Sequence, residues 1–304
     1  MKELYYKFSD YFRKQGFKGR VHKVTVDAGF SCPNRDGTRS RGGCIYCSNE
    51  GFSVHTRAPG LAIEQQIAQG MQALRKRFKA EKFIVYFQAY SNTYASVDQL
   101  KRAYDTIKQF PDVAGLAIAT RPDCIDEQIL ALIDSYTAKY DVWIEYGLQS
   151  IHNRTLVYIN RGHLYEDFLD AVYKTRKFKR IKICAHAIVG LPFETEAMIL
   201  DTARAIGQLK LDGVKIHPLH VIKGTALETL YRRGEFKPMT RDEYVDLAAK
   251  FLEYLWPQTV IQRLTADCPP DLLVAPLWLL EKQRVLSEIE RHLAAQHTFQ
   301  GRRF

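Results

Sequence analysis

The chain has 304 residues, of which 46% are hydrophobic and 26% are charged. This composition is typical of a globular protein with a sizeable core, and it excludes an intrinsically disordered chain. Lysine and arginine outnumber aspartate and glutamate by 44 to 34, so the formal net charge is +10 and a polyanionic partner such as nucleic acid is favoured.

The N-terminal residues 1–20 mix charged and aromatic side chains and lack the apolar core of a signal peptide. No later run is apolar enough to span a bilayer, so we expect a cytoplasmic protein that binds no membrane. In that reducing compartment a disulfide framework is not expected. Metal binding or redox chemistry is then the better explanation for any group of cysteines.

Short apolar, β-branched runs then alternate with amphipathic segments of helical length. The pattern predicts strands at residues 21–29, 82–90, 113–120, 141–149, 181–190 and 213–221. Helices are predicted near residues 61–79, 96–109, 125–138, 165–178 and 195–209. Ser96 and Gln99 have the spacing of a capping box at the start of the second helix. Strands that alternate with helices favour a parallel sheet with crossover helices.

We interpret residues 1–235 as a partial (β/α)6 TIM-like barrel. A doubly wound open sheet is the alternative, although the glycine-rich phosphate loops typical of that fold are absent from the sequence. Residues 236–304 are predicted to form a C-terminal α/β extension packed on the barrel, because no flexible linker precedes them. The extension contains a capping box from Thr240 to Glu243 that begins a helix, a candidate strand at 259–267 and a final helix near 277–296.

Three of the six cysteines, Cys32, Cys44 and Cys47, lie in a loop rich in glycine, proline and arginine directly after the first predicted strand. Such a loop offers free thiols no core in which to pack. Three thiolates with an open fourth position suit a [4Fe–4S] cluster. The alternative is a zinc site in which His22 or His55 supplies the fourth ligand.

The cysteine spacing C-x11-C-x2-C, with Tyr46 directly before the last cysteine, resembles the radical S-adenosylmethionine (SAM) superfamily, whose usual spacing is C-x3-C-x2-C. The longer first gap resembles the subgroup that contains the Elongator catalytic subunit. Further matches are TRPDC (120–124), EYGLQS (145–150), INRGH (159–163), HAIVGLPFET (186–195), GVKIHPLHVIKGTAL (213–227) and QRLTADCPPDLLVAPLW (262–278). They cover nearly the whole chain and resemble a bacterial family implicated in making aminomethyl-uridine from carboxymethylaminomethyl-uridine at the tRNA wobble position.

The resemblance implies a radical SAM enzyme that acts on tRNA. In such enzymes a [4Fe–4S] cluster on the three cysteines, reduced by a donor such as flavodoxin or ferredoxin, cleaves SAM to methionine and a 5′-deoxyadenosyl radical that abstracts hydrogen. The residues implied to bind SAM are Tyr46, Gln88, Gln149, Arg161 and Gly190. Arg161 could offer SAM a bidentate guanidinium across the barrel mouth, with a surface salt bridge as the alternative.

Several positions leave their roles open. Related proteins often have an acidic residue before TRPD, where this chain has Ala119, so that role is not carried over. Arg121 and Asp123 are either pocket residues or a mutual pair that stabilises their loop. Glu145 could face the barrel interior or a helix. The remaining cysteines are interpreted as packed or incidental thiols: Cys124, Cys184 and Cys268.

Three catalytic candidates lie on and after the sixth predicted strand: His217, His220 and Lys223. They could bind a carboxymethyl group or a phosphate, although a lone histidine on a strand is more often structural. Three functions stay open. The first is a tRNA-modifying radical SAM enzyme that removes hydrogen from a carbon next to the side-chain nitrogen and then breaks that C–N bond. The others are a zinc-stabilised RNA-binding protein without redox activity, and a radical SAM enzyme with a small-molecule substrate.

Overall fold

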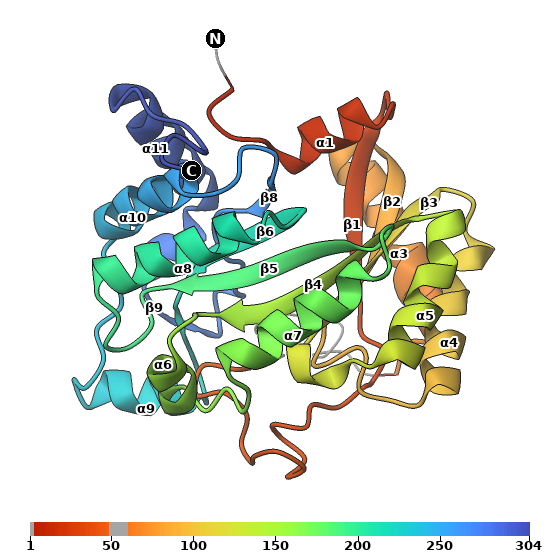
Figure 1. Ribbon diagram of the computed structural model, residues 1–304, viewed down its shortest axis with the longest axis horizontal. Helices are drawn as coiled ribbons and strands as arrows, with labels where there is room; N and C mark the ends of the chain where they lie inside the picture. The colour runs from red at the N-terminus through yellow and green to blue at the C-terminus, as the bar shows by residue number, and fades with distance from the viewer. Residues whose placement is uncertain (1–2, 49–59) are drawn as a thin grey trace.

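The computed structural model describes residues 3–48 and 60–304 (Figure 1). Parallel strands form one curled sheet in the spatial order β1-β2-β3-β4-β5-β6-β8. Their bounds are β1 (Arg20–Val26), β2 (Ala80–Phe87), β3 (Val113–Thr120), β4 (Asp141–Gln149), β5 (Lys182–Val189), β6 (Gly213–Pro218) and β8 (Val260–Arg263). Since the order follows the chain without reversal, the doubly wound alternative is wrong. The predicted α/β fold with a partial TIM-like barrel is confirmed, but the sheet has one more strand than the six predicted, because β8 from the predicted C-terminal extension pairs with β6.

The helices predicted between the strands are all present, and they cover the outer face of the sheet. They are α3 (Ile63–Phe78), α4 (Val97–Asp105), α5 (Glu127–Ser135), α7 (Tyr165–Arg176) and α8 (Glu196–Gln208). The predicted capping box begins α4, because Ser96 Oγ accepts from the Gln99 backbone N–H and Gln99 Oε1 accepts from the Ser96 N–H at 3.1 Å.

Shorter elements were not predicted, because one or two turns leave no readable period. They comprise the helices α1 (Phe8–Lys14), α6 (Asn153–Tyr158) and α9 (Ala226–Arg232), and the antiparallel pair β7 (Val221–Ile222) and β9 (Leu273–Ala275). Turns of 3-10 helix are η2 (Thr106–Gln109), η3 (Pro122–Cys124), η4 (Tyr136–Ala138) and η5 (Leu277–Leu280). The turn η3 follows the C-terminal end of β3, and the helix α6 follows the C-terminal end of β4. The functional site is expected at these strand ends.

Side chains along each strand alternate between the outer helices and the barrel interior. On β4 the outward side chains belong to the core beneath the helices: Val142, Ile144, Tyr146 and Leu148. The inward positions are Trp143, Glu145, Gly147 and Gln149. Glu145 therefore faces the barrel interior, which decides between the two positions that the sequence left open.

The N-terminal segment fills the end of the barrel interior at which the strands begin. The backbone N–H of Ile261 on β8 donates to the Tyr6 carbonyl at 2.8 Å, and α1 lies across the gap between β1 and β8 (Figure 1). Phe8 and Tyr11 pack edge-on to Trp143, with ring centroids 5.8 and 5.4 Å from it. These aromatic contacts close one end of the interior, so its open space lies toward the C-terminal ends of the strands.

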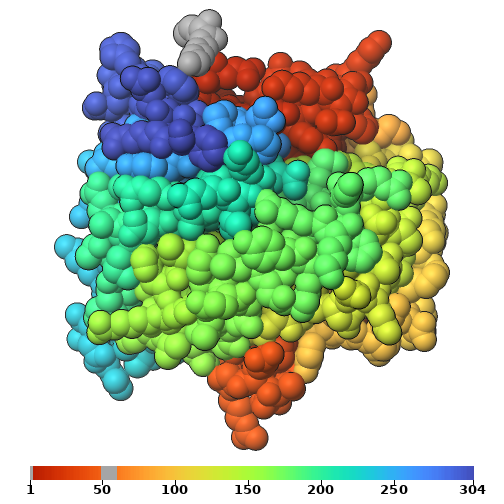
Figure 2. All heavy atoms as spheres, in the orientation of Figure 1, coloured from red at the N-terminus to blue at the C-terminus, as the bar shows by residue number. Residues whose placement is uncertain are grey.

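The C-terminal segment adds β8, α10 (Arg241–Glu253) and α11 (Lys282–Ala295). Glu243 accepts a hydrogen bond from the Thr240 N–H at 2.8 Å, so the second predicted capping box begins α10. α10 packs against both α8 and α11, and in Figure 2 these last helices lie beside the N-terminal segment. No helix within the described ranges is long and apolar enough to cross a bilayer.

We expect Phe12→Ala to weaken the fold strongly, because Phe12 is buried and packs edge-on to Phe8 and Phe17. The free energy of unfolding, measured by urea denaturation, should fall by about 3–5 kcal/mol. Phe304→Ala is the matched control, because Phe304 is half exposed at the chain end, and it should change little. Equal effects of the two substitutions would show that the N-terminal segment is not part of the core.

Candidate functional site

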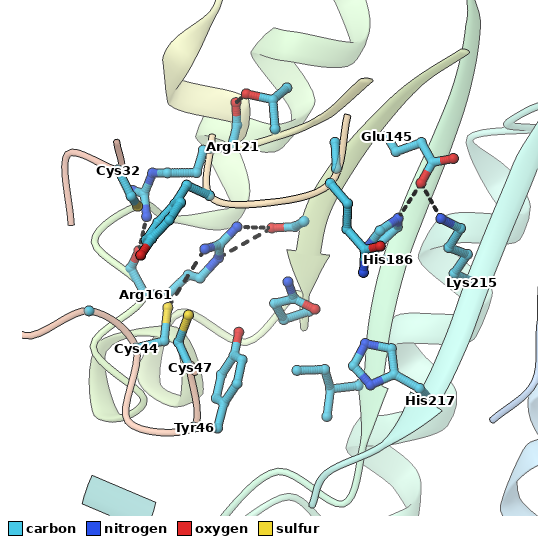
Figure 3. A pocket seen from close by; sticks show the side chains of 18 of the residues that line it. Cys32, Cys44, Tyr46, Cys47, Arg121, Glu145, Arg161, His186, Lys215 and His217 are labelled. Carbon is cyan, nitrogen blue, oxygen red and sulfur yellow. Dashed lines mark hydrogen bonds and ion pairs between the residues drawn. The ribbon is translucent and has the colours of Figure 1, made fainter. Parts of the chain in front are cut away.

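A cavity lies at the C-terminal ends of the strands, and two groups of side chains face each other across it (Figure 3). At one end are the three cysteines with Tyr46, Arg121 and Arg161. At the other end are Glu145, His186, Lys215 and His217. The first group comes largely from loops that follow strands, and the second from inward positions of β4, β5 and β6. The cavity therefore joins the loop predicted to bind metal to the interior of the barrel.

The cysteine loop is folded by its own backbone hydrogen bonds and protrudes from the molecule below the strands (Figure 2). The Cys47 N–H donates to the Cys44 carbonyl at 2.9 Å, and the Ile45 N–H donates to the carbonyl of Ile159 after α6 at 3.0 Å. Gly42 and Gly43 have φ values of 81° and 79°, which favour glycine. The three thiols are thus brought to one wall of the cavity, as the sequence predicts.

The surroundings of Cys44 fit a sulfur atom that carries negative charge, whereas those of Cys47 disfavour a thiolate that has no bound cation. Arg161 Nη1 and Asn34 Nδ2 both point at Cys44 Sγ, each at 3.6 Å. Burial, with Cys44 next in effect, raises the pKa of the Cys47 thiol to about 12, and Arg35 opposes this shift. A thiolate at such a position needs a bound cation, and the ligand softness of three thiolates suits iron in a cluster.

A zinc site has less support from the geometry. No three His, Cys, Asp or Glu side chains within residues 3–48 and 60–304 lie close enough together to hold one metal ion. Of the two histidines considered as a fourth zinc ligand, His22 stacks on Phe78 with ring centroids 4.8 Å apart, and His55 lies outside the described residues. In a cluster each thiolate binds a different iron, so the sulfurs need not meet at one point.

Gln149 and Arg161 meet at the end of β4, next to the cysteines. Gln149 has φ of 73°, and its buried Oε1 lacks a hydrogen-bond partner among the described residues. The Arg161 guanidinium donates to the Gly147 carbonyl at 2.8 Å and is only 7% exposed, so it forms no surface salt bridge. A Cβ at residue 147 would lie 2.5 Å from Arg161 Nη2, so this close approach requires glycine. A strained backbone and an unpaired acceptor are features of ligand sites.

The other predicted site residues separate into two groups. Tyr46, Gln88, His217 and His220 line the cavity. Gly190 and Lys223 are not among the residues that line it, and Lys223 is exposed beyond β7. Burial lowers the pKa of His217 well below its usual value, with the neighbouring His220 adding to the effect, so the imidazole is neutral.

Arg121 and Asp123 form a loop-stabilising pair, and Arg121 is also a pocket residue, so both roles that the sequence left open are present. The Arg121 guanidinium donates to both carboxylate oxygens of Asp123 at 2.9 and 2.8 Å, so the pair stabilises its own loop. Its Nη1 also donates to the Arg161 carbonyl at 2.7 Å, and Arg121 lines the cavity. Arg121 thereby positions Arg161 beside the cysteines.

The residues around Glu145 were missed by sequence reasoning. Glu145 is fully buried, and it accepts hydrogen bonds from Lys23 at 2.5 Å, from His186 Nε2 at 2.9 Å and from Lys215. Burial lowers the pKa of Lys215 to about 7 although Glu145 opposes this shift, and burial with Lys215 lowers the pKa of His186 to about 4. The inward alternation of Lys23 and Lys215 along their strands was the available signal.

Comparison with family models and known proteins agrees with this geometry. Residues 35–206 match the model of the Radical SAM superfamily, and residues 211–295 match the model of the Radical_SAM C-terminal domain. The uncharacterized protein YtqA of Bacillus subtilis is 36% identical over 302 residues, which are 99% of this chain and 94% of YtqA. The tRNA uridine(34) acetyltransferase of Methanocaldococcus infernus is 30% identical over 185 residues, which are 59% of this chain and 33% of that protein.

Among solved structures, the archaeal Methanocaldococcus infernus Elp3 with an N-terminal deletion has a TM-score of 0.63 at 20% identity. The similarity covers 92% of this chain and 64% of that chain. At this level of identity the two proteins share the fold, including the curled sheet whose strand ends form the cavity.

We expect Glu145→Gln to destabilise the protein by about 3–5 kcal/mol, because the buried Lys215 and the partly buried Lys23 lose the carboxylate that they share. Urea denaturation measures the loss. Glu127→Gln is the control, because the Glu127 and Lys177 side chains of that ion pair are 69% and 63% exposed and the free energy of unfolding should hardly change. If both variants unfold at the same urea concentration, Glu145 does not hold the two lysines.

Proposed function

This chain belongs to the radical SAM superfamily, and we propose that it is a tRNA-modifying enzyme that converts carboxymethylaminomethyl-uridine at the wobble position into aminomethyl-uridine. Enzymes of this superfamily use a [4Fe–4S] cluster and SAM. The observation that carries the proposal is one cavity with three cysteines at one end and buried cationic side chains at the other. The first end suits the cofactors and the second an anionic substrate group.

The residues present fit both cofactors. Cys32, Cys44 and Cys47 hold the cluster, with two N–H donors aimed at Cys44 Sγ. Gln149 Oε1, buried and unpaired within the described part of the chain, accepts a hydrogen bond from the SAM ammonium or a ribose hydroxyl, and Arg161 provides positive charge for the SAM carboxylate. When bound, the reduced cluster and SAM supply a one-electron reductant and an acceptor for a hydrogen atom.

Three observations support tRNA as the substrate. The chain has a formal net charge of +10, which favours a phosphate backbone. A relative that matches over 59% of this chain is named for its action on tRNA uridine(34). Tyr158 and Phe193, which follow β4 and β5, are 38% and 71% exposed, with ring centroids 4.8 Å apart. Exposed rings near the strand ends provide a surface on which a base splayed from the anticodon loop stacks.

The proposed reaction balances without a further oxidant. Loss of a hydrogen atom and an electron from the carbon between nitrogen and carboxylate turns the amine into an iminium ion. Water then breaks the C–N bond and gives aminomethyl-uridine and glyoxylate. The one electron released equals the one electron that SAM cleavage consumes, so SAM, the nucleoside and water would yield methionine, 5′-deoxyadenosine, aminomethyl-uridine and glyoxylate. A flavodoxin or ferredoxin serves as the electron donor that first reduces the cluster.

The test is anaerobic purification and turnover of the wild type and the variant in which Cys32, Cys44 and Cys47 are all alanine. The wild type should contain about four irons per chain and form 5′-deoxyadenosine, glyoxylate and aminomethyl-uridine from tRNA with the carboxymethylaminomethyl group. The triple variant should lose iron and all three products, whereas Cys268→Ala, outside the cysteine loop, should retain them.

Two outcomes would contradict the proposal in different ways. Bound zinc without SAM cleavage in the wild type would leave the RNA-binding alternative. Cysteine-dependent SAM cleavage with no change of the nucleoside, under conditions where the tRNA binds, would leave a radical SAM enzyme with a small-molecule substrate.

A further inference from the structure

We propose that Lys215, at the inner end of the cavity, forms an anion subsite that binds the carboxylate of the substrate side chain. The identity of this carboxylate rests on the proposed function. Lys215 lies on β6, is 3% exposed and lines the cavity at the end opposite the cysteines (Figure 3). The sequence indicates three candidates for binding an anion: His217, His220 and Lys223. The first two line the same cavity, whereas Lys223 is exposed outside it.

The charges around Glu145 cancel only while one of its two lysines is neutral. Lys23 and Lys215 share the single carboxylate of Glu145, while His186 donates to that carboxylate as a neutral imidazole. Burial lowers the pKa of Lys215 to about 7, and when Lys215 is protonated one positive charge is left over beside Glu145. Arg263 also lines the cavity and lies 3.7 Å from Asp267, a carboxylate that it shares with Lys282 at 2.7 Å. A buried charge is costly unless a counter-charge reaches it, and the cavity is the route by which one can arrive.

The uncompensated charge is better assigned to Lys215 than to Lys23. Lys23 Nζ donates to Gln262 Oε1 at 2.6 Å as well as to Glu145, and it is not among the residues that line the cavity. Lys215 Nζ donates to Glu145 Oε2 and lies 4.0 Å from the Tyr86 ring centroid; no other acceptor for it lies within the described residues. An ammonium has three donors, so Lys215 retains capacity on the cavity side.

The single ammonium of Lys215 favours a carboxylate as the anion. A carboxylate carries one negative charge and matches one ammonium, whereas a phosphate monoester would introduce about one and a half to two negative charges. The carboxymethyl group is the one anionic group on the proposed nucleoside side chain. With its carboxylate at Lys215, the side chain extends from the inner end of the cavity toward the cysteines, so its methylene carbons lie between the two groups of residues.

Binding without turnover tests the subsite. The protein carrying its cluster, without reductant, is titrated with an anticodon stem-loop RNA that contains carboxymethylaminomethyl-uridine and with the same RNA bearing the carboxamide in place of the carboxylate. The wild type should bind the carboxylate RNA about tenfold to a hundredfold more tightly, as expected for a hydrogen bond to a charged group. Lys215→Met should bind both RNAs equally.

Lys82→Met is the control, because it removes a lysine charge that pairs with Asp112 at 3.0 Å outside the cavity, and it should keep the preference for the carboxylate RNA. Lys215→Gln is the second variant, to be used if Lys215→Met does not fold, because the glutamine amide can still hydrogen-bond Glu145. It should lose the preference for the carboxylate RNA as Lys215→Met does. The inference is overturned if either folded Lys215 variant keeps the preference, or if the wild type has none. A wild type that forms aminomethyl-uridine yet ignores the carboxylate would contradict this inference alone, whereas failure to cleave SAM would contradict the proposed function.

Discussion

One buried carboxylate connects the parts of this barrel that the backbone leaves apart. The sheet is open between β1 and β8, and hydrogen bonding between neighbouring strands does not join β1 to β4 or β4 to β6. Glu145 on β4 supplies that connection through the interior, because it holds Lys23 of β1 and Lys215 of β6. Desolvating these charges is costly, and the mutual pairing offsets that cost only while the strands keep their curvature. The shape of the cavity therefore depends on this interaction.

The same interaction divides the barrel interior into layers with different tasks. Below Glu145, α1 and Trp143 fill the interior with aromatic rings. Above it, small or polar inward positions such as Gly147 and Gln149 leave space beneath the cysteine loop. Arg161 spans this space from Gly147 to Cys44, and Arg121 fixes its backbone. A cofactor on the cysteines and a substrate group at Lys215 would thus share one cavity.

The sequence predicted the local features of the chain, and it missed contacts between residues that are far apart in the sequence. Strand and helix order, both capping boxes and the cysteine loop were readable, because period and spacing are local signals. The partners of Glu145 were not, because Lys23 and Lys215 are 192 positions apart in the numbering and meet only when the sheet curls. Lys223 illustrates the opposite case: it follows the sixth strand in the sequence, but it comes directly after β7 and is not among the residues that line the cavity.

The central claim is that cofactor and substrate side chain meet in this one cavity. Deuterium transfer tests it most directly. The side chain of carboxymethylaminomethyl-uridine in tRNA is deuterated at both methylene carbons, and the 5′-deoxyadenosine formed with wild-type enzyme is analysed by mass spectrometry. The account predicts one deuterium in 5′-deoxyadenosine for each aminomethyl-uridine formed. Aminomethyl-uridine produced together with unlabelled 5′-deoxyadenosine would contradict it, because the abstracted hydrogen would then come from elsewhere.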